Sequence, residues 1–413
     1  MMTLPTRYRP ESAHGFLQNP TDGAQWRSEA LAQLKARGIP SPKLERWRYT
    51  NLAGFEKANA VPAQKPELSF NPITLPWMVQ NSRKLVFANG YLVFGDARLT
   101  LGGHLLEVPY DADPMEKFND GMLWALNTAF MQDGPYLNLH EDATIEIIHV
   151  GLGHDHPQLA SPRTVIEIAA GLNATIIEQY IADGAGVVHT NAALEIEVAA
   201  NANLKHIRIQ DEGYTRTILS STHARIARGA TYEHSFLNIG GALSRQEFWM
   251  ELLEEGAHAA VKGAQLVTGR QHMDTTVLIE HAAANCTSNQ TIRNVLAGDA
   301  VGVFQGKIHV HKIAQKTDGY QLCNTVMLSD RASMNTKPEL EIYADDVKCS
   351  HGNTVGALDD APLFYLRSRG IPEAEARRMM LTAFIGDLFD ALDDNIKDAL
   401  NKRVAQWLDH GIV

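Results

Sequence analysis

Residues 166–180 read IEIAAGLNATIIEQY, and residues 194–209 read LEIEVAANANLKHIRI. In both stretches apolar and polar residues alternate on either side of a corner of small residues, which is typical of two β-strands joined by a tight turn. A unit that returns along a chain in this way predicts a solenoid, in which each coil buries its apolar face only against its neighbours. The same pattern recurs in ARIARGATYEHSF (224–236), MELLEEGAHAAVKG (250–263), NVLAGDAVGVFQG (294–306) and LEIYADDVKCSHG (340–352).

The small corner residue serves as a marker of the repeat. Successive markers are separated by 28, 28, 27, 43 and 47 residues, and the last two intervals are interpreted as pairs of shorter coils of roughly 22 residues. A β-sandwich would instead need several two-residue hairpin turns, and only Asn89-Gly90 has that form. We therefore expect a mainly β fold built on a stacked β-solenoid. The markers are Ala174, Ala202, Ala230, Ala257, Ala300 and Val347.

The chain divides into three predicted segments. Residues 1–85 form a helical segment and linker, in which one helix is capped at Thr21 or Asp22 and ends at Arg37. Residues 86–357 form the β core, and residues 358–413 form a C-terminal helical domain. The last predicted helix carries an apolar stripe that must be buried against the solenoid or against another chain. The stripe consists of Ile396, Leu400, Val404, Trp407 and Leu408.

Composition excludes several classes of protein. The 413 residues include 37 basic and 48 acidic side chains, a net charge of −11, which disfavours nucleic acid as a partner. No apolar run approaches the length of a membrane helix, and the first twenty residues do not resemble a signal peptide. Only three cysteines occur, without a C-x-x-C pair, so a disulfide framework is excluded and a cytoplasmic protein is expected.

Nucleotide and metal motifs are weak in most of the chain. GVFQGKI at 302–308 lacks the spacing and the hydroxyl of a phosphate loop, so ATP binding is not expected. His309 and His311 alternate in a predicted strand and share a face. The segment with His272, Asp274, His281 and Cys286 has no second ligand pair that would complete a zinc pattern. For these histidines we favour polar strand residues on a solvated face.

Cys349-Ser350-His351 is more informative. Residues i and i+2 of a strand point to one face, so this thiol and imidazole could share an iron or zinc ion. Two ligands leave a tetrahedral site incomplete, and another chain would have to supply the rest. On spacing alone, a buried cysteine beside a hydrogen-bonded histidine is favoured. A Cys–His nucleophile pair is a third reading, but no orienting Asn or Asp can be identified.

A longer string changes this weighting. Residues 315–360 read QKTDGYQLCNTVMLSDRASMNTKPELEIYADDVKCSHGNTVGALDD, and residues 363–371 read LFYLRSRGI. Together with ERWRYTNL (45–52) and GVFQGKI, these strings closely resemble the SufB/SufD family of the SUF iron–sulphur cluster assembly machinery, and its D-type branch in particular. The resemblance follows nearly the whole chain in order.

The resemblance implies a non-enzymatic scaffold subunit with a right-handed parallel β-helix. It implies a SufB-like partner on the β-helix and a SufC-like ABC ATPase on the C-terminal helices, for which we name Phe364, Ile396, Leu400 and Trp407 as contacts. It also places Cys349 and His351 in the family's functional motif, as candidate ligands of iron or a nascent cluster at the interface of the two β-helices. No tightly bound cofactor is expected in the isolated chain, only transient iron or cluster in the complex.

Two further expectations complete this interpretation. A solenoid ends in an unpaired strand edge, so the isolated chain is expected to cover its edge by forming a homodimer. The rival interpretation is a carbohydrate-active β-helix enzyme, which would need paired carboxylates on one face. Asp345 and Asp346 are adjacent in a predicted strand and would point to opposite faces. A purely structural interaction protein without a metal role is not separated from the scaffold by sequence.

Overall fold

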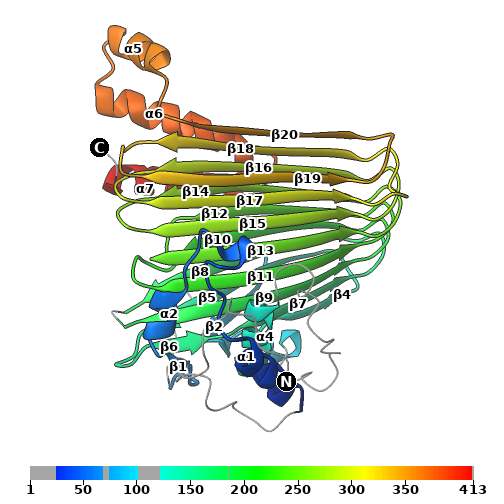
Figure 1. Ribbon diagram of the computed structural model, residues 1–413. Helices are drawn as coiled ribbons and strands as arrows, with labels where there is room; N and C mark the ends of the chain where they lie inside the picture. Colours follow the sequence, from blue (N-terminus) through cyan, green and yellow to red (C-terminus); the bar gives the residue numbers. More distant parts are fainter. Residues whose placement is uncertain (1–24, 68–73, 101–120, 185, 412–413) are drawn as a thin grey trace.

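A computed structural model describes residues 25–67, 74–100, 121–184 and 186–411. It confirms the predicted mainly β fold: a parallel β-solenoid of about eight turns, with helices at both ends (Figure 1). Two ten-stranded sheets form its walls. The first sheet contains β1 (Val61–Pro62), β4 (Tyr136–Leu139), β6 (Gln158–Ala160), β7 (Arg163–Ile168), β9 (Val188–Val198), β11 (Thr217–Ile226), β13 (Leu243–Leu252), β15 (His272–His281), β17 (Val301–Val310) and β19 (Ser333–Ile342). The second sheet contains β2 (Arg83–Ala88), β3 (Tyr91–Phe94), β5 (Ala143–Leu152), β8 (Asn173–Asp183), β10 (Asn203–Asp211), β12 (Thr231–Asn238), β14 (His258–Val267), β16 (Thr287–Leu296), β18 (Asp318–Met327) and β20 (Lys348–Gly356).

The repeat is more regular than the sequence markers suggested. Strands β10, β12, β14, β16, β18 and β20 begin 28, 27, 29, 31 and 30 residues apart, and each pairs in parallel with the next. The expected coils of roughly 22 residues are therefore wrong. Ala300 misled the count because it lies at the opposite corner, immediately before β17 of the first sheet.

One corner of the solenoid repeats a left-handed backbone position. The N–H of each residue at this position donates to a carbonyl of the next coil, for example Asn201 to Arg228 and Lys316 to Asp346. Glycine and asparagine tolerate a positive φ, whereas Lys316 adopts a φ of 59° without that tolerance. The repeated positions are Gly171, Asn201, Gly229, Gly256, Asn285 and Lys316.

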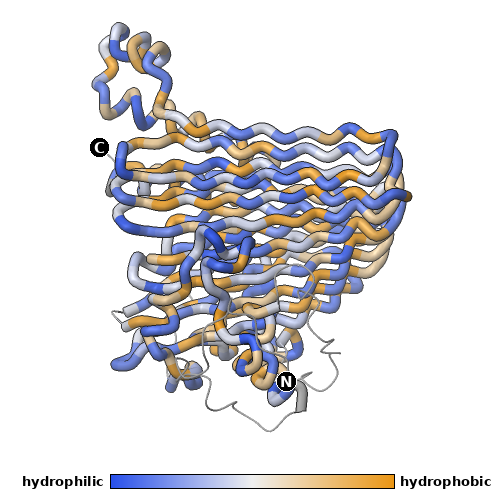
Figure 2. The backbone as a smooth tube through the Cα atoms, viewed as in Figure 1, coloured by the Kyte–Doolittle hydropathy of each residue, from blue (hydrophilic) through white to orange (hydrophobic). Residues whose placement is uncertain are grey.

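Alternate side chains of each strand fill the space between the sheets, and the alternation is visible along the strands in Figure 2. Phe87 and Ile147 of the second sheet and Phe248 of the first belong to one continuous inner core. The predicted hairpin at Asn89-Gly90 lies at the N-terminal end of this core. There β2 and β3 run antiparallel, and Asn89 and Gly90 take the positive φ of a hairpin turn.

The N-terminal elements cover the outer face of the first sheet at the early coils. Helix α1 (Gln25–Arg37) ends where predicted, and its Leu34 is buried in a cluster that reaches Leu219 of β11. The predicted cap at Thr21 or Asp22 lies outside the described residues. The remaining elements are η3 (Glu45–Trp47), α2 (Ala53–Lys57), η5 (Ala97–Leu99) and α4 (Met122–Phe130).

With one exception, the C-terminal helical elements cover the outer face of the second sheet. They are α5 (Asp360–Ser368), α6 (Glu373–Gly386), η7 (Asp387–Phe389) and α7 (Asp394–Gly411). The apolar stripe of α7 packs with Leu388 and with Ile207 and Leu237 of the sheet. Arg293 of β16 also donates to Asp387, at 2.7 Å from Nη2 to Oδ2. By contrast, α5 projects beyond the last coil (Figure 1).

Candidate metal site in the terminal coil

Strand β20 closes the second sheet and carries the predicted Cys349 and His351. It pairs with β18 on one side, and its other edge pairs with no strand in the described part of the chain. Lys348 donates its N–H to Thr317 in the β18 coil. Since N–H groups alternate along a strand, those of Cys349 and His351 point away from β18 toward the free edge. The main chain of this edge is therefore available to another strand.

The strand register places both predicted ligands on the inner face. His351 pairs with Gln321 and Cys349 pairs with Gly319, two β18 residues that are buried between the sheets. Across the solenoid, the amide of Asn353 donates to the hydroxyl of Thr336 on β19. Because no described coil lies above them, inward side chains of β20 reach the open end of the solenoid.

The two candidate ligands differ in environment. Cys349 is half-buried and packs in a small apolar cluster with Leu340 and Val347, whereas His351 is exposed. Burial raises the pKa of the Cys349 thiol above its ordinary value, so the thiol is protonated at neutral pH. A metal ion would therefore have to displace a proton from Cys349, while a neutral imidazole binds metal directly.

A polar row lies beneath His351 that the sequence analysis missed. Following the register inward from His351, the same position holds Gln321, Gln290, Val261, His234 and then His206. The side-chain amides of Gln290 and Gln321 are buried and have no hydrogen-bond partner in the described chain. Only the correct repeat length reveals this row, because its members lie one coil apart in sequence.

In the early coils the same row is closed and hydrogen-bonded. His206 Nδ1 lies 3.2 Å from Nδ1 of His234, and its Nε2 lies 3.1 Å from Oε2 of Glu178. Burial alone would raise the pKa of Glu178, but the imidazoles of His149 and His206 outweigh it and hold this pKa well below its usual range.

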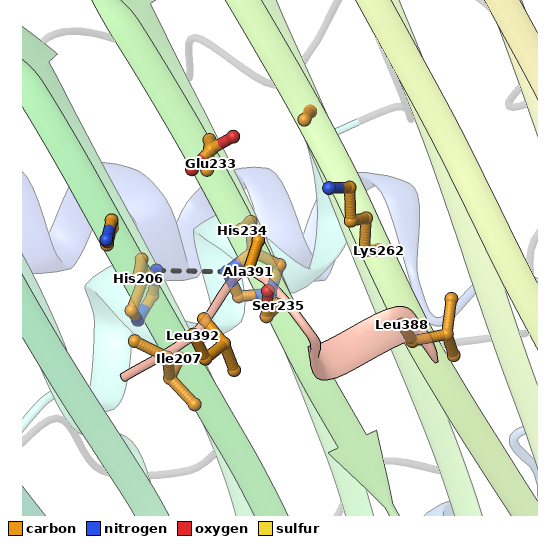
Figure 3. A pocket seen from close by; sticks show the side chains of 11 residues that line it. His206, Ile207, Glu233, His234, Ser235, Lys262, Leu388, Ala391 and Leu392 are labelled. Atoms are coloured by element: carbon orange, nitrogen blue, oxygen red, sulfur yellow. Dashed lines mark hydrogen bonds between the residues drawn. The ribbon is translucent and has the colours of Figure 1, made fainter. Parts of the chain in front are cut away.

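A small pocket lies on the outside of these strands (Figure 3). The segment that carries Leu388 and Leu392 runs across the outer face of the strands there. The charged side chains of Glu233 and Lys262 also line the pocket. This pocket is a seam between the C-terminal segment and the solenoid, and no metal-binding group of three ligands lies in it within the described residues.

The structure does not bring the four predicted residues of segment 272–286 together in one cluster. His272 and Asp274 both contact Thr50 on the outer face of the first sheet, at 3.0 Å for the His272 Nε2. His281 points inward, with its Nε2 2.8 Å from the hydroxyl of Ser288. Cys286 is buried at a corner and donates to the carbonyl of Glu254.

His309 and His311 do lie together, and a carboxylate that the sequence analysis did not consider joins them. One potential ligand atom from each of Glu280, His309 and His311 lies within 4.8 Å of the others. GVFQGKI, which precedes them, lies within β17 as expected and is not a phosphate loop.

The carboxylates considered for the rival hypothesis of a carbohydrate-active enzyme do not lie where the sequence predicted. Asp345 and Asp346 lie in the corner between β19 and β20, so the strand alternation used to separate them does not apply. Glu167 and Glu197 are paired in register on β7 and β9 and line one hollow of the surface. Glu197, however, is held by Arg225 at 3.0 Å from Nε to Oε1. This arrangement is an ion-paired sheet surface.

The predicted partner contacts separate into two groups. Ile396, Leu400 and Trp407 are buried against the chain's own second sheet, so they are not available to a partner, and that part of the prediction is corrected. The stripe needed burial, and sequence could not say which surface would provide it. Phe364 is 74% exposed on α5, next to Tyr365 at 56%.

Among the described helices, none is both long and apolar enough to span a membrane.

The comparisons with known proteins agree on one family. Residues 139–384 match the family model described as SUF system FeS cluster assembly, SufBD core domain. The chain is 31% identical to the iron–sulphur cluster assembly protein SufD of Escherichia coli, over 96% of each chain. It is 28% identical to a SufBD family iron–sulphur cluster assembly protein of Synechocystis, over 91% of this chain and 88% of the relative. A SufBD family protein of Mycobacterium leprae is 30% identical over 88% of each chain.

Proposed function

The chain belongs to the SufBD family of SUF-system iron–sulphur cluster assembly proteins, and from this premise we propose that it is a D-type, non-catalytic scaffold subunit. Iron, sulphide or a nascent cluster is its cargo, held transiently in a complex and not as a resident cofactor. The observation that carries the proposal is the terminal strand β20, whose outer edge pairs with no described strand and which carries a cysteine and a histidine, two residue types that can bind metal. Cytoplasmic localisation is part of the same proposal.

The first proposed partner is a SufB-like subunit that pairs with the end of the solenoid. The outward N–H groups of β20 would add to a strand of that subunit, and His351 would contribute an imidazole to a site completed by the partner's ligands. In the isolated chain the same edge would pair with a second copy. A single substitution tests the edge: Val355→Pro removes an N–H that points away from β18, and Val355→Ala is the matched control.

We expect the proline variant to lose co-purification with the SufB-like subunit and to become monomeric in light scattering, with an unchanged circular dichroism spectrum. The alanine variant keeps both contacts. Equal binding by the two variants would show that the edge of β20 is not the docking surface.

The second proposed partner is a SufC-like ABC ATPase bound to the C-terminal helical segment, residues 358–413. Exposed Phe364 and Tyr365 on α5 are the supporting observation, since neighbouring exposed aromatic side chains are enriched in protein interfaces. Deleting the segment is a poor test, because α6 and α7 cover the second sheet. Phe364→Ala with Tyr365→Ala should instead abolish ATPase binding, while Tyr214→Ala, which removes an aromatic 58% exposed elsewhere, should not.

The proposed role of the site is tested by comparing His351→Ala with Cys349→Ala in a strain that depends on this pathway. His351→Ala should reduce cluster assembly more, because the Cys349 thiol is protonated and half-buried. Complex formation, measured in parallel, should stay intact in both variants. Full cluster assembly by His351→Ala within an intact complex would remove the metal role and leave a purely structural interaction protein.

A further inference from the structure

Glu280, His309 and His311 form a second cluster of potential metal ligands on the outer face of the first sheet. Glu280 of β15 and His309 of β17 are paired in register, and His311 follows β17 by one residue. One potential ligand atom of each residue lies within 4.8 Å of the others. The cluster is separate from Cys349 and His351, which lie on the inner face of the second sheet.

Neighbouring side chains hold this cluster in place. His309 Nδ1 lies 3.1 Å from Oε1 of Glu280, and the indole Nε1 of Trp249 donates to Oε2 of the same carboxylate at 3.3 Å. The ring of Tyr343 stands edge-on to His309 at 5.7 Å between centroids. The contacts of Trp249 and Tyr343 come from outside the cluster, and ligands held in this way lose little freedom when they bind an ion.

The second imidazole supplies an independent observation. The ring centroids of His309 and His311 are 4.6 Å apart, and Nε2 of His311 is buried without a hydrogen-bond partner in the described chain. A buried nitrogen without a partner is unfavourable, and a coordinated cation would satisfy it.

We propose that Glu280, His309 and His311 bind a divalent first-row transition-metal ion. Two imidazole nitrogens and one carboxylate oxygen are a donor set suited to Zn²⁺ or Fe²⁺, and hard ions such as Mg²⁺ prefer all-oxygen sites. The side chains of Glu280 and His309 are 20% and 23% exposed, so the remaining coordination positions face solvent. The proposal is independent of the role assigned to the terminal coil.

Metal binding by the full chain, without an affinity tag, tests the proposal. After EDTA treatment and dialysis, Zn²⁺ uptake is measured by calorimetry, and Co²⁺ is added to record the ligand-field absorption of a nitrogen- and oxygen-coordinated ion. We expect one equivalent in the unaltered chain. His309→Ala and His311→Ala should each weaken this binding by about tenfold or more, and Glu280→Gln should also weaken it.

Two controls separate this site from other histidines. His258→Ala removes an imidazole of β14 that lies 2.7 Å from the hydroxyl of Thr287 and belongs to no group of three potential metal ligands among the described residues, and binding should be unchanged. The double variant Cys349→Ala/His351→Ala should also keep the Zn²⁺ equivalent. Binding that survives in His309→Ala and His311→Ala, or that is absent from the unaltered chain, would overturn the proposal and leave a surface ion pair. Binding lost only in Cys349→Ala/His351→Ala would overturn it in favour of the terminal coil.

Discussion

His206 and His351 occupy the same inward row of the second sheet, but they lie in opposite surroundings. His206 is enclosed in the early coils, where it contacts His234 and Glu178, whereas His351 lies in the last coil that the structure describes. The register that closes a polar group in the middle of the solenoid exposes it at the end. A histidine in this row is therefore structural or available for binding according to its coil, and the residue type alone does not decide.

The largest expected effect is in the closed coils. Glu178→Ala should lower the free energy of unfolding by about 3–5 kcal/mol, because it removes the carboxylate from a buried, hydrogen-bonded cluster. Urea denaturation measures the change. Glu233→Ala on the outer face of β12 is the matched control and should cost less than about 0.5 kcal/mol. Equal losses in the two variants would break the comparison, since burial would then not distinguish them.

A pH dependence should also come from the closed coils. Burial, with the nearby charge of His258, lowers the pKa of His281 from 6.5 to about 4. Below pH 6.5 the unfolded chain takes up a proton that the folded chain refuses, so stability should fall as the pH decreases toward 4. This residue should account for about 3 kcal/mol of the loss. In His281→Gln, urea midpoints between pH 7.5 and 4 should fall less steeply, and parallel slopes would contradict the assignment.

A glycine at the corner next to the open end, in place of Lys316, should increase the stability of the chain. Lys316 is a non-glycine residue at positive φ, so Lys316→Gly should relieve backbone strain and stabilise the chain by about 0.5–1 kcal/mol. Lys348→Gly, in the neighbouring strand β20, should instead cost a similar amount because the strand loses a side chain. Thermal unfolding of both variants tests the opposite signs, and a loss in both would remove the argument from strain.

The smallest effect is expected at the open end itself. Cys349→Ala/His351→Ala should change the free energy of unfolding by less than about 0.5 kcal/mol, since His351 is exposed and Cys349 only half-buried. Urea denaturation of the double variant provides the measurement. A loss comparable with that of Glu178→Ala would show that the terminal coil is as closed as the early coils and would remove the distinction between the closed coils and the open end.

The fold could be predicted from alternation and repetition, but the register could not. Both corners of the solenoid carry small residues. Ala300 was therefore counted with the corner before the second sheet, although it lies at the corner before the first sheet. Cys286 and Thr317, which lie immediately before β16 and β18, are not conspicuous as corner residues. With a coil of about 29 residues, Glu280 would have been placed beside His309 directly from the sequence.

The shared face of Cys349 and His351 was predictable because the two residues are neighbours in one strand. Cys349 and His351 need only the period of a β-strand to share a face. The partner contacts needed tertiary information, because the stripe of Ile396, Leu400 and Trp407 fits a chain's own sheet as well as another protein. Hydrophobic patterning shows that a face must be covered and does not identify what covers it.

Only three residues, 357–359, separate the end of β20 from the start of α5. Even fully extended, such a link spans about 10 Å, so it takes up little slack. The side chain of Asp359 also caps α5 by accepting from the N–H of Ala361 at 2.9 Å, which joins the link firmly to the helix. A pulling force applied to α5 is therefore transmitted to the C-terminal end of β20. There it acts on the backbone hydrogen bonds to β18 one after another. A sufficient force on α5 would therefore detach from the solenoid the strand that carries Cys349 and His351.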